Sequence, residues 1–131
     1  MTNVTIEPAF EADLQELIQS GLANQRDQGL EILVMAEQLE ENGPIVECLK
    51  VKRYSDDDFD IDEIVSQQAE GRNLWRLKHF KVRDYRVVYC IFADRNFEVI
   101  HLLGIMPRTE NYEKDGSKFR RILEVYDELN K

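Results

Sequence analysis

The residues best suited to chemistry are basic and lie in the second half of the chain. In residues 74–78 (LWRLK), the period of two that a strand imposes places Arg76 and Lys78 on one face and Trp75 and Leu77 on the other. We therefore expect a strand with one core face and one cationic face.

Three more candidate groups, Arg86, Arg108 and Tyr112, lie on or just beyond two later apolar runs. If these runs are adjacent antiparallel strands, all of the groups can meet in one shallow depression. Cations that gather without matching carboxylates bind anions, and phosphate is the usual one. The alternative is that these residues form an ordinary solvated strand face.

The charge of the chain is unevenly divided. The net charge of −9 argues against a generic nucleic-acid binder, which is normally basic. Residues 1–71 hold 4 Lys and Arg against 17 Asp and Glu, whereas residues 72–131 hold 13 against 9. This asymmetry predicts a basic site on the C-terminal half, and an acidic surface that either stays in solvent or lies near that site.

Composition favours one domain spanning residues 1–131, because a hydrophobic content of 43% is enough for one core. No stretch approaches the ~18 apolar residues of a membrane span, and the N-terminus lacks the pattern of a signal peptide. We therefore expect a cytoplasmic protein without a membrane partner. Cys48 and Cys90 lack metal-ligand spacing and are expected to be reduced thiols. No motif indicates a cofactor or a metal.

The first half of the chain predicts a strand, then a helical hairpin, then an irregular segment. A short strand containing Val4 and Ile6 precedes helical apolar spacing over residues 10–22 and 30–39. Residues 45–54 fit either a strand or an extended connection.

The acidic stretch of residues 55–70 predicts a solvated loop that leads into a short helix, with Asp60 as its N-cap and Gly71 at its end. A calcium loop starting at Asp56 is excluded, because isoleucine and glutamine stand where it needs glycine and glutamate. Two placements stay open. The segment lies near the cationic face and competes with phosphate, or it points away from the sheet.

The last third of the chain changes to a period of two. Three strand-like runs follow one another: 74–80, 85–92 and 97–106. They are separated by turns of hairpin length and predict an antiparallel meander. The third run is apolar on both faces, as in a central strand, and strict alternation places Leu103 and Ile105 on the same face. An amphipathic helix with Ser117 as its cap follows.

The remaining aromatic and histidine residues have structural explanations. Tyr85 and Tyr89 share a face with aliphatic residues, and Trp75 alternates with the cations, so all three are expected to be core aromatics. His101 is expected to be buried and hydrogen-bonded, and His79, beside a turn, is a candidate base outside the predicted site.

The order and spacing of these runs resemble the RelE/ParE toxin superfamily. Four pieces carry the resemblance: residues 74–78 (LWRLK), residues 84–89 (DYRVVY), residues 99–108 (VIHLLGIMPR), and Tyr112. They are similar to the basic strand, the YRVxY strand and the terminal arginine and tyrosine of that superfamily. The resemblance implies an α+β fold in which an N-terminal strand and helical hairpin pack on an antiparallel sheet that ends in the three-strand meander.

The resemblance also implies a metal-independent endoribonuclease that cleaves messenger RNA and inhibits translation. Carried over by position, the catalytic residues are Lys78, Arg86, Arg108 and Tyr112. The RNA-binding residues are Arg76, Lys81 and Arg83. In RNA cleavage the 2′-hydroxyl attacks the adjacent phosphate, so the site must accept a proton, stabilise phosphate charge and protonate the leaving 5′-oxygen. Lys78 suits the first task, the two arginines the second, and Tyr112 suits base stacking or proton transfer.

Family members are usually shorter and basic, whereas this chain carries an acidic insertion around residues 55–70 and is acidic overall. The same fold also hosts gyrase-directed and non-catalytic binding modules, which form the alternative reading. Toxins of the superfamily are usually neutralised by a small antitoxin. The resemblance therefore implies a cognate antitoxin as partner, together with RNA and the ribosome if the protein is catalytic.

Overall fold

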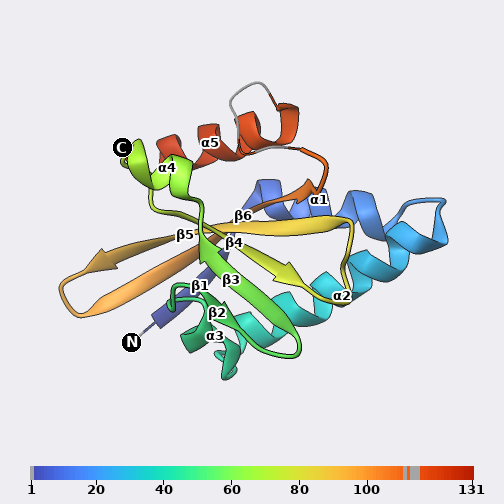
Figure 1. The fold of residues 1–131 in the computed structure, drawn as a ribbon, viewed down its shortest axis with the longest axis horizontal. Coiled ribbons are helices and arrows are strands. Elements are labelled where there is room, and N and C mark those ends of the chain that lie inside the picture. The colour runs from blue at the N-terminus through green and yellow to red at the C-terminus, as the bar shows by residue number, and fades with distance from the viewer. Residues whose placement is uncertain (1, 111, 113–115) are drawn as a thin grey trace.

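The computed structural model describes residues 2–110, 112 and 116–131. These residues form an α+β fold with a six-stranded mixed sheet of strand order β1-β6-β5-β4-β3-β2 (Figure 1). The strands are β1 (Thr2–Ile6), β2 (Tyr54–Ser55), β3 (Phe59–Glu63), β4 (Leu74–His79), β5 (Tyr85–Asp94) and β6 (Phe97–Pro107). The helices in this part of the chain are α1 (Pro8–Ile18), α2 (Ala23–Glu40), α3 (Ile45–Cys48), α4 (Val65–Ala69) and α5 (Ser117–Leu129).

Helices cover both faces of the sheet, so the sheet has a core on each side (Figure 1). Phe10 of α1 and Leu39 of α2 are fully buried in the first core. Phe119 and Tyr126 of α5 are buried in the second. In the ranges that the structure describes, no helix is both long enough and apolar enough to cross a membrane.

The predicted N-terminal strand and helical hairpin are confirmed. β1 pairs in parallel with β6, and Val4 lies opposite Ile100. The two helices of the hairpin pack closely at Gly29, where an added Cβ would lie 3.0 Å from the Cβ of Leu17. The hairpin therefore rests on the sheet as one closely packed pair of helices.

The prediction of a strand or extended connection over residues 45–54 was wrong for its first part. Residues 45–48 form α3, and only Tyr54 and the residue after it form a strand, β2. Ile45, Val46 and Leu49 are buried, which is helical spacing. The run was too short for this period to be distinguished from alternation.

The prediction that Asp60 caps a helix was also wrong. Asp60 lies within β3, which pairs antiparallel with β4 and places Asp60 opposite Lys78. Ile61 is fully buried between two aspartates, so the stretch alternates as a strand does, although its apolar positions are few. The helix that follows, α4, ends shortly before Gly71, whose φ of 83° fits the predicted terminating glycine.

The antiparallel meander is confirmed, and β6 is central, between β1 and β5. Strict alternation along β6 was wrong, because the β5–β6 register shifts between Val88 and Tyr89, which lie opposite Gly104 and Leu102. Leu103 is the extra residue. As a result, Leu103 joins the α5 side and Ile105 the α1–α2 side.

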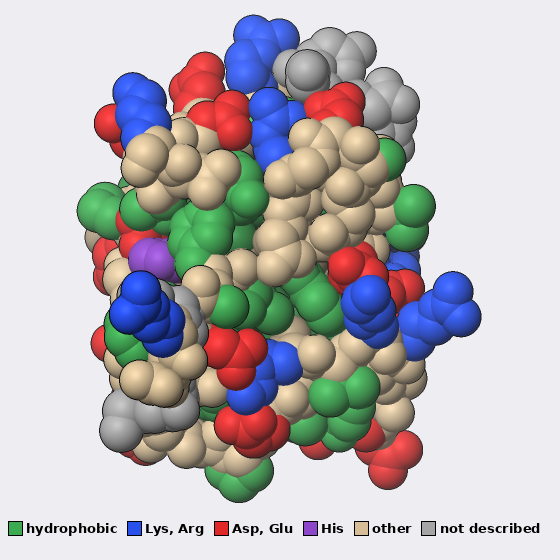
Figure 2. Space-filling view, turned by 90° about the vertical axis from the view of Figure 1, so that its left-hand side faces the viewer, with side chains coloured by type: hydrophobic (Ala, Val, Ile, Leu, Met, Phe, Trp, Pro, Cys, Tyr) green, Lys and Arg blue, Asp and Glu red, His purple; other side chains and the backbone are tan. Residues whose placement is uncertain are grey.

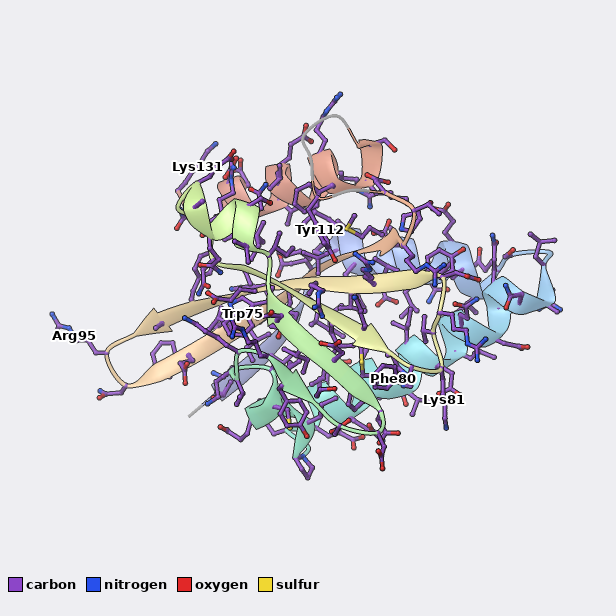
Figure 3. The ribbon with its side chains drawn as sticks, viewed as in Figure 1. Trp75, Phe80, Lys81, Arg95, Tyr112 and Lys131 are labelled. Atoms are coloured by element: carbon purple, nitrogen blue, oxygen red, sulfur yellow. The ribbon has the colours of Figure 1, made fainter. Side chains whose placement is uncertain are left out.

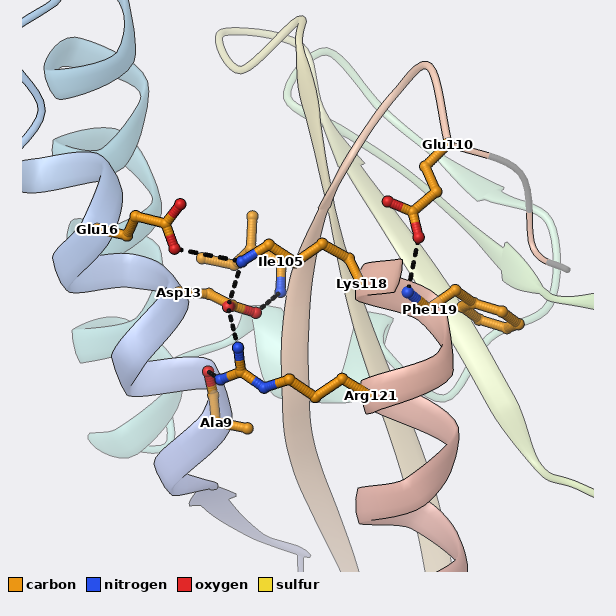
Figure 4. Close-up of polar contacts among 8 residues, drawn as sticks. All are labelled: Ala9, Asp13, Glu16, Ile105, Glu110, Lys118, Phe119 and Arg121. Atoms are coloured by element: carbon orange, nitrogen blue, oxygen red, sulfur yellow. Dashed lines mark hydrogen bonds and ion pairs between the residues drawn. The ribbon is translucent and has the colours of Figure 1, made fainter. Parts of the chain in front are cut away.

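The predicted last helix is present, but Ser117 is its first residue and not its cap, because Gly116 occupies the N-cap position. A side chain from outside the helix supplies the missing acceptor. The carboxylate of Glu110 accepts a hydrogen bond from the backbone N–H of Phe119 at 2.8 Å (Figure 4). The helix start is thereby tied to the segment that follows β6.

Candidate functional site

An open pocket of about 220 Å³ lies where the C-terminal end of β4, the start of β5 and the end of β6 meet. Its lining residues are Lys78, His79, Phe80, Val82, Arg83, Tyr85, Arg86 and Arg108. Among these described residues four are cationic and none is a carboxylate. The structure therefore brings together three of the predicted catalytic residues, Lys78, Arg86 and Arg108, and one of the predicted RNA-binding residues, Arg83.

Lys78 is half-buried on β4, on the face that also carries Arg76. No described residue forms a hydrogen bond or ion pair with its ammonium group. Burial, followed by the positive charges of Arg76 and Arg86, lowers the pKa of Lys78. No described carboxylate lines the pocket to offset this positive charge.

Tyr112 contacts the guanidinium group of Arg86 through both its hydroxyl and its ring. Its Nη1 donates a hydrogen bond to the hydroxyl of Tyr112 at 3.0 Å, and its guanidinium carbon lies 5.5 Å from the centre of that ring. Tyr112 in turn packs edge-on against Phe119 of α5. Burial raises the pKa of Tyr112, while the hydrogen bond from Arg86 opposes that rise. Tyr112 therefore orients Arg86 and does not line the pocket.

One polar atom of Arg86 is left without a partner. Its Nε is buried, and no described group accepts a hydrogen bond from it. Such an orphan donor is uncommon in folded proteins and often marks a functional position.

Arg76 is engaged by the neighbouring acidic strand. Its Nη1 lies 3.0 Å from the carbonyl oxygen of Asp60 and 3.2 Å from the carboxylate of the same residue. The acidic segment thus lies near the cationic face, as one of the two alternatives required, and its competition with phosphate stays a prediction. Arg76 is half-buried beside Lys78 and does not line the pocket.

The turn between β4 and β5 positions the remaining basic residues. Val82 is buried in the core and fixes the turn, while Lys81 and Arg83 on either side of it are exposed. The backbone N–H of Arg108 donates to the carbonyl of Asp84 at 2.8 Å, which ties the end of β6 to this turn. Lys81 lies beside a second hollow with Asn24 and does not line the first.

Asp84 is the acidic group closest in sequence to the pocket, and its carboxylate binds side chains of α2 instead of the cations of the pocket. Its carboxylate accepts hydrogen bonds from Gln28 at 2.8 Å and from Asn24 at 3.0 Å. These bonds lower the pKa of Asp84, with smaller contributions from Arg108 and Arg83. The carboxylate therefore stays ionised beside α2.

His79 is a pocket residue that the sequence placed outside the site. Its Nδ1 accepts a hydrogen bond from the backbone N–H of Lys81 at 3.1 Å, so the neutral ring carries its proton on Nε2. Burial lowers the pKa of His79. The neutral ring is therefore a hydrogen-bond donor at Nε2. Only its position before a turn could have drawn attention to it.

The structural explanations of the other aromatic residues mostly hold. Trp75 and Tyr89 are buried in the core, and Tyr89 donates a hydrogen bond to the carbonyl of Leu49 at 2.8 Å. His101 is half-buried, with Nδ1 3.1 Å from the carboxylate of Glu7. Tyr85 differs, because it is only half-buried and borders the pocket.

The side of the molecule that carries the β5–β6 turn differs from the pocket in its charge. There, basic and acidic side chains are interspersed (Figure 2). Within the described part of the chain, no group of three or more His, Cys, Asp and Glu residues is placed to hold a metal ion.

The chain was compared with known proteins at three levels. It matched no family model, no curated protein and no solved structure.

Proposed function

We propose that this protein is a RelE-like endoribonuclease toxin that cleaves messenger RNA without a metal and so inhibits translation. The observation that carries the proposal is the pocket lined by four cations and by no carboxylate of the described chain. An open cationic hollow of this kind suits a phosphodiester. The order of elements, a strand and helical hairpin followed by a meander, supports the RelE/ParE arrangement.

In the proposed reaction, the 2′-oxygen of RNA bonds to the adjacent phosphorus as the bond to the 5′-oxygen breaks. Lys78, in its neutral form, accepts the proton of the 2′-hydroxyl. Its pKa is lowered by burial and by the neighbouring arginines, so the neutral form is more accessible than in an ordinary exposed lysine. Arg86 and Arg108 stabilise the charge that develops on the phosphate oxygens. The leaving 5′-oxygen takes a proton from solvent, and the product ends in a 2′,3′-cyclic phosphate.

The other predicted residues have supporting roles in this proposal. Tyr112 positions Arg86 through its hydroxyl, and Arg76 sets the electrostatics of Lys78 from the neighbouring position on the same face. Arg83 and Lys81 bind the RNA backbone beside the pocket. A cognate antitoxin is the proposed protein partner, and the ribosome is the proposed place of action.

Growth of cells that express the protein tests the proposal. Expression should slow growth, and the double variant Arg86→Ala/Arg108→Ala should relieve the effect. The matched control is Arg95→Ala/Lys131→Ala, which removes the same charge at positions far from the pocket (Figure 3). Equal toxicity of the two double variants would contradict the proposed site.

The alternative reading, a gyrase-directed or non-catalytic binding module, gives a different result in the same cells. A gyrase-directed module should inhibit DNA supercoiling and leave ribosome-bound messenger RNA intact. A non-catalytic module should neither inhibit DNA supercoiling nor cleave messenger RNA.

A further inference from the structure

Phe80 is an aromatic side chain that the fold holds partly in solvent. It follows β4 directly, and 49% of it is exposed. Its position is fixed, because its backbone N–H donates to the carbonyl of Asp58 at 2.9 Å. Two residues later Val82 is buried, and its N–H donates to the carbonyl of His79 at 2.8 Å. The exposure of Phe80 is therefore built into a well-anchored turn.

Phe80 lies between two hollows. It lines the cationic pocket with Lys78, and it also lines the second hollow, beside α2, with Asn24 and Gln28. Arg83 borders both hollows as well. Figure 3 shows Phe80 and Lys81 together at the β4–β5 turn, whereas Tyr112 lies on the side of α5. An aromatic surface thus adjoins the cationic pocket, and charged and amide groups lie on its other side.

We infer that Phe80 stacks against the base of the nucleotide next to the phosphate in the cationic pocket, which makes the protein selective for unpaired RNA. The inference deepens the proposed function and rests on it for the position of the phosphate. Every base has an apolar face that can stack on an aromatic ring, so this contact tolerates different sequences. A base inside a duplex has both faces covered by its neighbours and cannot reach Phe80 without being unstacked.

Charge complementarity argues for a nucleic acid over an apolar partner at this surface. A protein segment that covered Phe80 by hydrophobic contact would have to bury the adjacent cations Lys78, Arg83 and Arg108 without counter-charges. A polynucleotide offers a phosphate and a stacking face on each residue, which matches the arrangement of pocket and ring.

Binding of 2′-O-methyl oligoribonucleotides tests the inference, because these probes lack the attacking hydroxyl and stay intact. Three probes are compared by fluorescence anisotropy: a single strand, the same strand in a duplex, and a single strand with abasic sites. Phe80→Ala should weaken binding of the ordinary single strand by about 5- to 150-fold, which is the range for loss of one stacked base. It should change binding of the abasic strand less than twofold.

Two further variants separate stacking from general disturbance. Phe80→Trp should retain the affinity for the single strand, because it keeps an aromatic face. Phe97→Ala removes another exposed phenylalanine, 42% exposed and at the start of β6, and should leave all three affinities unchanged. Equal weakening of the ordinary and abasic strands by Phe80→Ala, or no weakening of either, would overturn the inference.

The outcomes also separate this inference from the proposed function. Binding that depends on Phe80, without cleavage of ribosome-bound messenger RNA, would support the stacking site and contradict the endoribonuclease. Cleavage that persists with unchanged RNA affinity in Phe80→Ala would contradict the stacking site alone. If none of the probes binds, the stacking inference is wrong, while cleavage of ribosome-bound messenger RNA tests the endoribonuclease separately.

Discussion

Replacement of Asp13 with alanine should strongly reduce the free energy of unfolding. Asp13 lies on α1 and only 5% of its side chain is exposed. Its carboxylate accepts the backbone N–H of Ile105 on β6 at 3.0 Å and pairs with Lys118 and Arg121 of α5 at 2.9 and 3.4 Å (Figure 4). One side chain therefore connects the helices on both faces of the sheet to the strand that leads to Arg108.

The size of the effect follows from what the alanine variant leaves behind. The N–H of Ile105 would be buried without an acceptor, at a cost of about 1–3 kcal/mol. The side chains of Lys118 and Arg121 are 26% and 43% exposed and can regain water. Loss of their ion pairs with Asp13 therefore costs less than the about 3–5 kcal/mol that follows from breaking a fully buried ion pair. We expect a total decrease of about 2–4 kcal/mol.

Urea unfolding of three variants measures this effect. Asp13→Asn keeps an oxygen for Ile105 but removes the charge, so it should lose about half as much as Asp13→Ala. Glu16→Ala is the matched control, because Glu16 pairs with the same lysine at 3.3 Å but is 71% exposed. The control should change the free energy of unfolding by less than about 1 kcal/mol. The reasoning is refuted if Asp13→Ala is no more destabilising than Glu16→Ala.

Three further variants test other parts of the structure. Gly104→Ala should destabilise the fold by about 1–3 kcal/mol, because the new Cβ would lie 2.7 Å from Ile122; an unchanged urea midpoint would contradict this packing. The pKa of His79 is lowered in the folded protein, so the unfolded chain binds a proton on His79 at a higher pH than the folded protein does. The free energy of unfolding should therefore decrease as pH falls below 6.5. Urea unfolding at several pH values should show that His79→Asn removes this dependence. Asp60→Asn should release Arg76 and tighten RNA binding at low salt, and the gain in affinity should shrink as salt rises. If the variant and the unaltered protein bind RNA equally at low salt, the Asp60–Arg76 ion pair has only a structural role.

The sequence predicted well those parts of the fold in which the local pattern of apolar and polar residues decides which side chains are buried. In β4 the alternation of cations with Trp75 and Leu77 is local, and the structure shows Trp75 and Leu77 buried. The helical hairpin was predicted for the same reason, since its apolar spacing spans several turns.

The errors arose where a tertiary partner decides the structure. β3 is a strand because β4 offers it a pairing edge, although aspartates flank its one fully buried residue, Ile61. The bulge at Leu103 depends on the register with β5 and reverses the face of every later residue of β6. The positions of His79 and Phe80 in the pocket depend on how the β4–β5 turn is anchored by Val82, which the residue types do not specify.

The chemical ends of the RNA product provide the most direct test of the proposed endoribonuclease. Ribosome-bound messenger RNA is incubated with the protein, and the fragments are analysed by mass spectrometry. The proposal predicts an upstream fragment ending in a 2′,3′-cyclic phosphate, lost in Arg86→Ala/Arg108→Ala and retained in Arg95→Ala/Lys131→Ala. Intact RNA, or fragments that end in a 3′-hydroxyl with a 5′-phosphate on the other piece, would contradict it.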